Sequence, residues 1–257
     1  MIFNKDKKFL IGMIHLPPLL SIDGFPGMDF CIKKALHDLE ALQSAGYDGA
    51  LLENENDKPH TENVNQAQIA SMSIIAWEVM KKAKIPVGVQ LLLNDWKSSF
   101  DVAKAVGAKF TRLDVFVDDV SCKWCDIFPK PKEIMDYKNS FYPELTLFTD
   151  IQVKYKTMFD KNKTLQQSAQ ECIDYKSDGI IITGTATGVE TPIEKIKTIR
   201  NAFPDATLLA GAGINKDNIL EQFKYLNGAI VGSSIKTGDD VDYAKAKELI
   251  DILRNNF

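Results

Sequence analysis

The sequence of 257 residues contains no apolar run long enough to span a lipid bilayer. The apolar stretch near its start, residues 9–20, is too short and is interrupted by His15, Pro17 and Pro18. It also lacks the small-residue cleavage site of a secretory signal. We therefore predict that this stretch is a buried strand that leads into a loop, and that the protein is cytoplasmic.

The chain also lacks a strong charge imbalance. Its 31 Lys and Arg residues are nearly balanced by 35 Asp and Glu residues, which leaves a net charge of −4. A nucleic acid or an anionic membrane attracts a basic surface, so neither is expected as a partner. The chain is 45% hydrophobic and 26% charged, which is ordinary for a globular protein with a large core.

Cysteine is scarce, because four residues in a chain this long do not form a disulfide framework. Cys122 and Cys125 form a CxxC motif, but no second CxxC and no nearby histidine pair completes a zinc site. A redox motif would open a helix after a strand, whereas this one falls in a loop-like segment. We predict free thiols, which suits a reducing cytoplasm.

Linkers and low-complexity segments are missing too, so residues 1–257 are predicted to form one domain. Short β-rich apolar runs alternate with helical patterns throughout the chain; residues 29–46, for example, place Ile32, Leu36, Leu39 and Leu42 on one helical face. The region from 118 to 141 is the least regular. The expected strands are residues 9–15, 48–54, 86–95, 109–117, 144–155, 179–184, 206–211 and 228–233. About eight β–α repeats predict a single (β/α)8 TIM barrel.

Glycine is concentrated at the ends of the last three expected strands, in "TGTATG", "AGAGI" and "VGSSIK". Turns between strands and helices favour glycine in any case, so each turn alone is weak support for a site. Barrels of this class, however, often hold a phosphate at the loops after their last two strands. We therefore predict a phosphate-binding site at the C-terminal face, formed by Gly184, Thr185, Gly188, Gly211, Gly213, Gly232 and Ser233.

The other strand ends carry polar groups that folding does not require. Asp150, Gln152 and Lys154 alternate along the fifth expected strand, so all three are predicted to face the barrel interior. The alternative is a buried network that only fills the barrel, with Arg112–Asp114 and Asp150–Lys154 as its ion pairs. The remaining candidates for positioning a substrate are Asn54, Gln90 and Asn94, alongside Gln152.

If the site is catalytic, Lys154 is a candidate base or Schiff-base nucleophile. Glu53, Asp114 and Asp150 are candidates for proton transfer with His15 as a partner, and Arg112 could stabilise an enolate oxygen. Isomerisation, epimerisation and aldol cleavage all use these groups, and the sequence does not choose among them.

No cofactor is assigned. An oxygen-rich group at Glu53, Asp95 and Asp114 would suit Mg²⁺ or Mn²⁺ better than zinc. Glu55, Asp57 and His60 lie in the nearby segment "LLENENDKPH". The alternative for this segment is a solvated loop in which its short polar side chains cap turns.

Seven segments, spread over nearly the full length of the chain, resemble those of a known protein family. They are "IGMIHLPPL", "DGALLEN" with Asp57-Lys58-Pro59, "GVQLLLND", "DIQVK", "TGTATG", "AGAGI" and "GAIVGSSIK". Through them the sequence resembles the BtpA/SgcQ family. The resemblance implies a TIM barrel of the ribulose-phosphate-binding kind. Relatives often read "GSG" where this chain has Ala210 and Ala212, so only backbone donors are left there.

Two functional hypotheses follow. The first is an isomerase, epimerase or lyase that acts on a small phosphorylated metabolite, such as a phosphosugar or a nucleotide-derived compound. The second is a non-catalytic assembly factor, because the family is named for a factor needed for photosystem I accumulation, although members occur in organisms without photosynthesis. The second hypothesis predicts a closed barrel mouth and a functional apolar patch. A homo-oligomer is expected for a barrel of this size.

Overall fold

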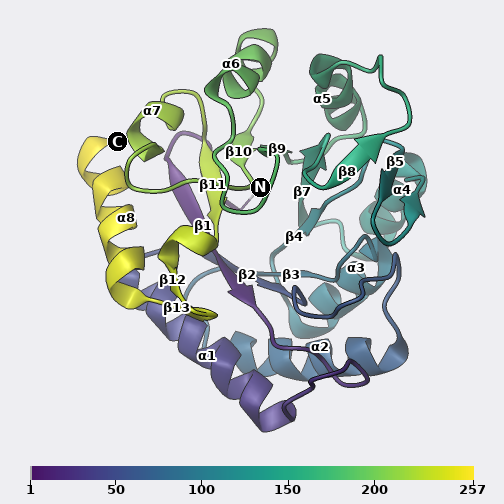
Figure 1. Ribbon diagram of the computed structural model, residues 1–257, viewed down its shortest axis with the longest axis vertical. Coiled ribbons are helices and arrows are strands. Elements are labelled where there is room, and N and C mark those ends of the chain that lie inside the picture. The colour runs from purple at the N-terminus through teal and green to yellow at the C-terminus, as the bar shows by residue number, and fades with distance from the viewer. Residues whose placement is uncertain (1) are drawn as a thin grey trace.

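Eight parallel strands close into a barrel in the computed structural model, which describes residues 2–257 (Figure 1). Strand β1 pairs with β2 on one side and with β11 on the other, so that Gly12 faces both Ala50 and Val231 and the sheet has no free edge. The predicted TIM barrel is therefore confirmed. Its strands are β1 (Phe9–His15), β2 (Gly49–Glu53), β3 (Val87–Gln90), β4 (Phe110–Leu113), β7 (Thr146–Ile151), β9 (Gly179–Ile182), β10 (Leu208–Ala210) and β11 (Gly228–Val231).

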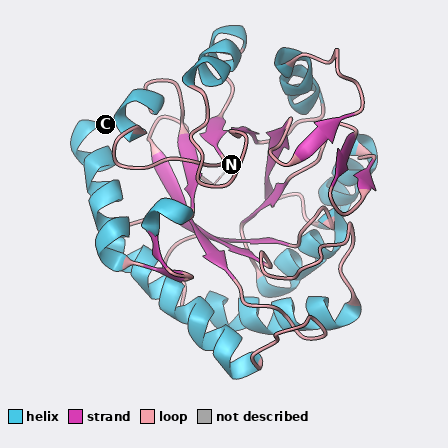
Figure 2. Ribbon diagram, viewed as in Figure 1, coloured by secondary structure: helices cyan, strands magenta, loops and turns pink. Residues whose placement is uncertain are grey.

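Helices surround the barrel (Figure 2). Asn65 and Thr164 begin two of them with reciprocal capping boxes, and Gly46 and Gly107 end two others in the left-handed conformation. Among the described residues, no helix combines the length and apolarity needed to cross a membrane. The helices are α1 (Met28–Ala45), α2 (Gln66–Met80), α3 (Trp96–Val106), α4 (Pro131–Phe141), α5 (Leu165–Asp174), α6 (Ile193–Ala202), α7 (Ile219–Gln222), α8 (Tyr243–Asn256) and the 3-10 turn η1 (Ser233–Ile235).

The fifth barrel strand is shorter than the predicted 144–155. Strand β7 ends at Ile151, and the positive φ values of Gln152 (43°) and Tyr155 (62°) turn the chain away from the barrel. The chain then forms β8 (Lys156–Met158), which pairs with β5 (Val120–Cys122) in a small separate sheet that also contains β6 (Asp126–Ile127). The predicted alternation of residues 150, 152 and 154 is therefore wrong, because no continuous strand carries them.

The CxxC motif lies at the tip of the hairpin that joins β5 to β6, and the Cys122 N–H donates to the Cys125 carbonyl at 3.0 Å. The expected loop-like segment is thus the tip of a hairpin, in which Cys122 ends β5 and residues 123–125 lead into β6. All four cysteines are free thiols in the structure, as predicted.

Aromatic rings fill the N-terminal end of the barrel. The Phe3 ring stacks on Phe9 at a centroid distance of 4.7 Å and meets the edge of Phe110 at 5.4 Å. Small residues opposite make room for these rings, since a Cβ atom on Gly88 would lie 2.5 Å from Phe110. The filled bottom confines open space inside the barrel to the C-terminal mouth.

We expect the substitution Phe110→Ala to lower the free energy of unfolding by about 3–5 kcal/mol, because it leaves a cavity in this ring cluster. Urea denaturation measures the loss, with Phe30→Ala as a matched control on the exposed start of α1. The control should change stability by less than about 0.5 kcal/mol. Equal stability of the two variants would show that the ring cluster does not support the barrel.

Candidate functional site

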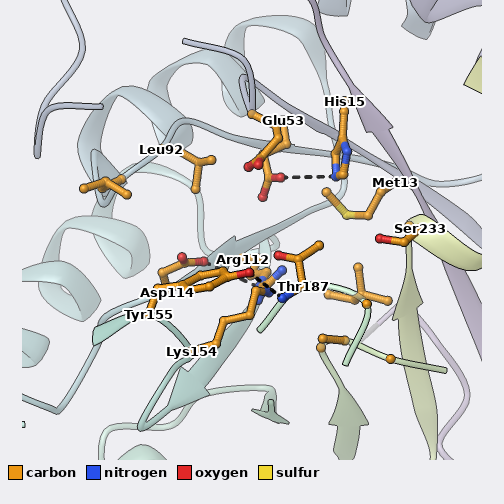
Figure 3. A pocket seen from close by; sticks show the side chains of 18 of the residues that line it. Met13, His15, Glu53, Leu92, Arg112, Asp114, Lys154, Tyr155, Thr187 and Ser233 are labelled. Atoms are coloured by element: carbon orange, nitrogen blue, oxygen red, sulfur yellow. Dashed lines mark hydrogen bonds and ion pairs between the residues drawn. The ribbon is translucent and has the colours of Figure 1, made fainter. Parts of the chain in front are cut away.

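A cavity of about 720 Å³ opens at the C-terminal mouth of the barrel. Side chains from the ends of β1, β2 and β4 line it, together with Lys154 after β7 and glycines after β9, β10 and β11 (Figure 3). Of the predicted site residues, the cavity brings together His15, Glu53, Arg112, Asp114, Lys154, Gly188, Gly211, Gly213, Gly232 and Ser233.

His15 and Glu53 form a pair at the ends of neighbouring strands, with 3.5 Å between His15 Nε2 and Glu53 Oε2. Glu53 is only 5% exposed. Burial, followed by the charges of Glu55 and Asp114, raises the pKa of Glu53 to about 8. Burial and the nearby Lys236 lower the pKa of His15 well below its usual value. At neutral pH the pair therefore consists mainly of a protonated carboxyl and a neutral imidazole.

Arg112 is held by a bidentate ion pair. Its Nε and Nη2 donate to the two carboxylate oxygens of Asp150 at 2.7 and 2.8 Å. Asp150 is buried and does not line the cavity, whereas Arg112 does. The structure thus places Asp150 behind Arg112, as the group that fixes and neutralises the guanidinium.

Asp114 is held from two other sides. Lys156 Nζ donates to its Oδ2 at 3.0 Å and Gln90 Nε2 donates to its Oδ1 at 2.9 Å. Burial alone would raise the pKa of Asp114, but Lys156 and Arg112 outweigh it and hold that pKa well below its usual range. Sequence reasoning missed Lys156, because it follows the strand on which Lys154 was expected.

Lys154 is left without a partner. The sequence-based alternative paired Lys154 with Asp150, but Asp150 is taken by Arg112. Within residues 2–257, no hydrogen bond or ion pair engages the Lys154 ammonium group, although its backbone N–H donates to Thr183 Oγ1 at 3.1 Å. A free cation consequently faces the cavity near Arg112 and Asp114 (Figure 3).

Glycines form the opposite rim. Gly188 and Gly213 have φ values of 75° and 76°, a backbone conformation that residues other than glycine rarely adopt. Gly213 also packs so tightly that an added Cβ would lie 2.2 Å from the Val189 carbonyl oxygen. The N–H groups of Gly213 and Ser233 donate no hydrogen bond within the described part of the chain. This rim can therefore offer backbone donors to an anion.

Two residues expected at this rim lie elsewhere. Gly184 is buried, and an added Cβ there would lie 2.7 Å from the Glu190 carbonyl oxygen, so it serves the close return of the loop. Thr185 is exposed but does not line the cavity, and Thr187 takes that place.

The four amides predicted to position a substrate lie behind the cavity and hold loops together. Asn54 accepts from the Leu92 N–H at 2.7 Å, and Asn94 bonds both backbone groups of Val115. Gln90 donates to Asp114 as described, and Gln152 donates to the Lys163 carbonyl at 3.0 Å. Gln152 points toward α5 because its positive φ turns it out of the strand. None of the four lines the cavity formed by the described residues.

The oxygen-rich metal group is not assembled. Asp95 accepts from the Ser98 and Val64 N–H groups, and it is the N-cap of α3. It does not line the cavity with Glu53 and Asp114. Across residues 2–257, no group of three or more His, Cys, Asp or Glu side chains is arranged to hold a metal ion.

Comparison with known proteins identifies the family. The model of the BtpA family matches residues 6–255. The chain belongs to the BtpA family. Its relatives include an Archaeoglobus fulgidus protein that is 32% identical over 95% of this chain and 98% of its own length. The photosystem I biogenesis protein BtpA of Synechocystis is 29% identical, covering 91% of this chain and 83% of the relative.

Solved structures support the fold of this BtpA-family chain. Thiamine phosphate pyrophosphorylase from Pyrococcus furiosus superposes with a TM-score of 0.63 at 16% identity, over 99% of this chain and 98% of the other. At this identity the likeness shows a shared barrel only, and the chemistry must be argued from the cavity.

Glu53 should make stability depend on pH. The unfolded chain loses this proton near pH 4.5, whereas the folded protein holds it to about pH 8, so the free energy of unfolding falls between these pH values. We expect Glu53→Gln, which cannot ionise, to gain roughly 2–4 kcal/mol relative to wild type between pH 5 and pH 9. Urea unfolding at both pH values measures this gain. The exposed control Glu144→Gln should show none, and a pH-independent difference for Glu53→Gln would contradict the assigned pKa.

Proposed function

We propose that this BtpA-family chain is an enzyme that moves a proton at the carbon next to the carbonyl of a small phosphorylated compound. Isomerases, epimerases and aldol-type lyases share this step. One observation carries the proposal: an acid–base pair, an unpaired ammonium group and a glycine rim share a single cavity. Lys154 is partly exposed to this cavity and makes no ion pair within residues 2–257, so its ammonium group is available to a ligand.

The phosphate is assigned to the glycine rim. Strands β10 and β11 are the seventh and eighth of the barrel in chain order, and barrels commonly bind phosphate after these strands. Gly211, Gly213, Gly232 and Ser233 line the cavity at this position. The free N–H groups and the Ser233 hydroxyl supply donors, while the missing side chains let the anion approach the backbone.

We assign the role of general base, which removes the proton from carbon, to Glu53. A general base works best when its pKa lies near the working pH, and the pKa of Glu53 is raised to about 8. Ionised Glu53 would remove the proton from carbon and return it to the neighbouring carbon or oxygen. Neutral His15 would donate a hydrogen bond to the carbonyl oxygen, and Lys154 would stabilise the negative charge that develops there. Arg112 lines the cavity beside these groups in a fixed position, with its charge balanced by Asp150.

The assembly-factor hypothesis predicts a closed mouth, and the open, charged cavity speaks against it. The role named for the Synechocystis relative therefore does not account for these side chains. A cytoplasmic location and self-association stay predictions. We propose a homo-oligomer as the default for a barrel of this size, which light scattering after size-exclusion chromatography would measure.

Thermal unfolding with phosphate, sugar phosphates and nucleotides, each with and without Mg²⁺, tests the phosphate site. A ligand at 100 times its dissociation constant stabilises the fold by about 2.7 kcal/mol. The substitution Gly232→Leu should abolish this shift, because Gly232 lines the cavity at the proposed anion site and a leucine side chain would fill that space, although the added Cβ itself fits at 3.5 Å from His15. Asp205→Leu, in the loop before β10, is the control and should keep the shift. Absence of any shift in the wild type would remove the basis for a phosphorylated ligand.

Proton abstraction can be tested before the substrate is known. In D₂O, the enzyme should exchange deuterium into the carbon next to the carbonyl of ketose and aldose phosphates, as followed by NMR. We expect Glu53→Gln to slow the exchange by about 10²–10⁴-fold, the range for loss of a general base. For the wild type the rate should rise with pH up to about 8 as Glu53 ionises. If a phosphate ester binds but Glu53→Gln exchanges at the wild-type rate, Glu53 is not the base.

A further inference from the structure

The cavity extends beyond the charged centre to a second end. We call this part the distal end and define it by His60, Leu92, Leu93, Trp124 and Tyr155, all of which line the cavity. Figure 3 shows Leu92 and Tyr155 on one side of Arg112 and Ser233 on the other. Leu92 of the distal end therefore lies across the charged centre from Ser233, whereas Tyr155 borders the Thr187–Gly188 loop of the glycine rim through its hydrogen bond with Thr187.

Three loops and a hairpin are fixed together to form the distal end. Leu93 packs with Val120 and Ile127 of the hairpin in a small hydrophobic cluster. The Leu93 N–H donates to the Thr61 carbonyl at 3.0 Å, which holds the His60 segment against the same loop. These contacts make the distal end a built part of the fold.

Flat aromatic surfaces rim the distal end. Tyr155 is 64% exposed, yet its hydroxyl accepts the Thr187 N–H at 2.8 Å, so the ring is held in place while its surface stays open. Trp124 is 39% exposed, and Lys123 Nζ lies 4.3 Å from its ring centroid. Leu92 and Leu93 provide a buried apolar floor. Large exposed aromatic rings beside a cavity favour stacking with a flat ligand group.

His60 adds a polar requirement. It is only 9% exposed, and its Nδ1 atom has no hydrogen-bond partner among the described residues. A buried polar atom without a partner is costly, and a turn of the His60 ring that brings Nδ1 to a ligand atom in the cavity would relieve the cost. An aliphatic group would leave Nδ1 unpaired, whereas the edge of a heterocycle carries donors and acceptors.

The volume agrees with a second ligand group. Sites of about 300–1,000 Å³ typically enclose drug-sized ligands, and this cavity of about 720 Å³ lies in the upper half of that range. A phosphate and a short carbon chain at the rim and centre would leave the distal end to water.

We propose that the distal end binds a planar nitrogen heterocycle of nucleobase type, so that the substrate carries such a ring in addition to its phosphate. Trp124 and Tyr155 stack on the ring and His60 bonds its edge. This inference rests on the proposed function, because it deepens the substrate class of the same cavity. The charged centre then lies between ring and phosphate, where the sugar carbons of a nucleotide-like compound would be.

Calorimetric titration of the full chain compares four probes: ribose 5-phosphate, uridine, UMP and AMP. We expect UMP or AMP to bind at least 10-fold more tightly than ribose 5-phosphate. Trp124→Ala should weaken nucleotide binding about 5- to 100-fold, the range for loss of one base–aromatic contact, and change ribose 5-phosphate binding less than about 2-fold. Trp77→Ala, on the exposed face of α2, is the matched control and should change neither.

Two further readouts separate stacking from a general loss of structure. Tryptophan fluorescence should be quenched by the nucleotide in the wild type and in Trp77→Ala but not in Trp124→Ala. His60→Phe keeps a ring but removes the polar edge, and it should weaken nucleotide binding while sparing ribose 5-phosphate.

The outcomes distinguish this inference from the proposed function. Ribose 5-phosphate binding as tightly as the nucleotides would overturn the ring site and leave the phosphate site standing. Uridine binding without any contribution from phosphate would keep the ring site and overturn the phosphate site. If none of the four probes binds, both proposals fail.

Discussion

The ion pair between Arg112 and Asp150 is the constraint on which the site depends. A guanidinium buried at the centre of a barrel is tolerated only when its charge is paired and its hydrogen bonds are made, and Asp150 supplies two of them. The pair fixes β4 to β7 from the inside. Gly211 lies beside it, where an added Cβ would meet Ile181 at 2.4 Å and Thr183 at 2.8 Å. The glycine of the anion rim is therefore required mainly by the packing of β9 and its following loop.

The pair also decides which groups stay available for chemistry. Once Arg112 has taken Asp150, Asp114 is matched by Lys156 and Gln90, and Lys154 is left over. Lys156 and Arg112 hold the pKa of Asp114 low and keep it ionised, whereas burial, followed by the nearby cations, lowers the pKa of His15 and keeps it neutral. Glu53 alone among the lining acids has its pKa raised to about 8, because burial and its acidic neighbours outweigh the cations. The pKa values of two carboxyl groups in one cavity are thus shifted in opposite directions, up for Glu53 and down for Asp114. Acid–base catalysis uses this arrangement.

The sequence predicted the barrel and most of its mouth for a simple physical reason: parallel strands that end at one face bring their last residues together. His15, Glu53 and Arg112 could be found in this way. Their pairing could not, because the register of the neighbouring strands β4 and β7 decides that Asp150 meets Arg112, and Lys156 reaches Asp114 from β8, beyond the end of β7. The prediction that Gln152 faces the barrel interior failed because side-chain alternation requires an extended backbone, and the φ of 43° at Gln152 ends the strand. Trp124 and His60 lie in segments without periodicity, so no strand-end rule could place them over the cavity.

The charged groups of the site lie on strand ends and the distal end is formed by loops, and each placement has a physical reason. The pKa of Glu53 depends on burial and on charges at fixed positions, and short barrel strands hold such positions rigidly. The distal end instead depends on surface that must remain exposed until a ligand covers it, which loops and the hairpin provide. Two buried polar atoms, His60 Nδ1 and Gln90 Oε1, lack partners around the mouth within residues 2–257. Of these two residues only His60 lines the cavity, so a ligand can be the missing partner of His60 alone, whereas Gln90 lies behind the cavity and holds Asp114.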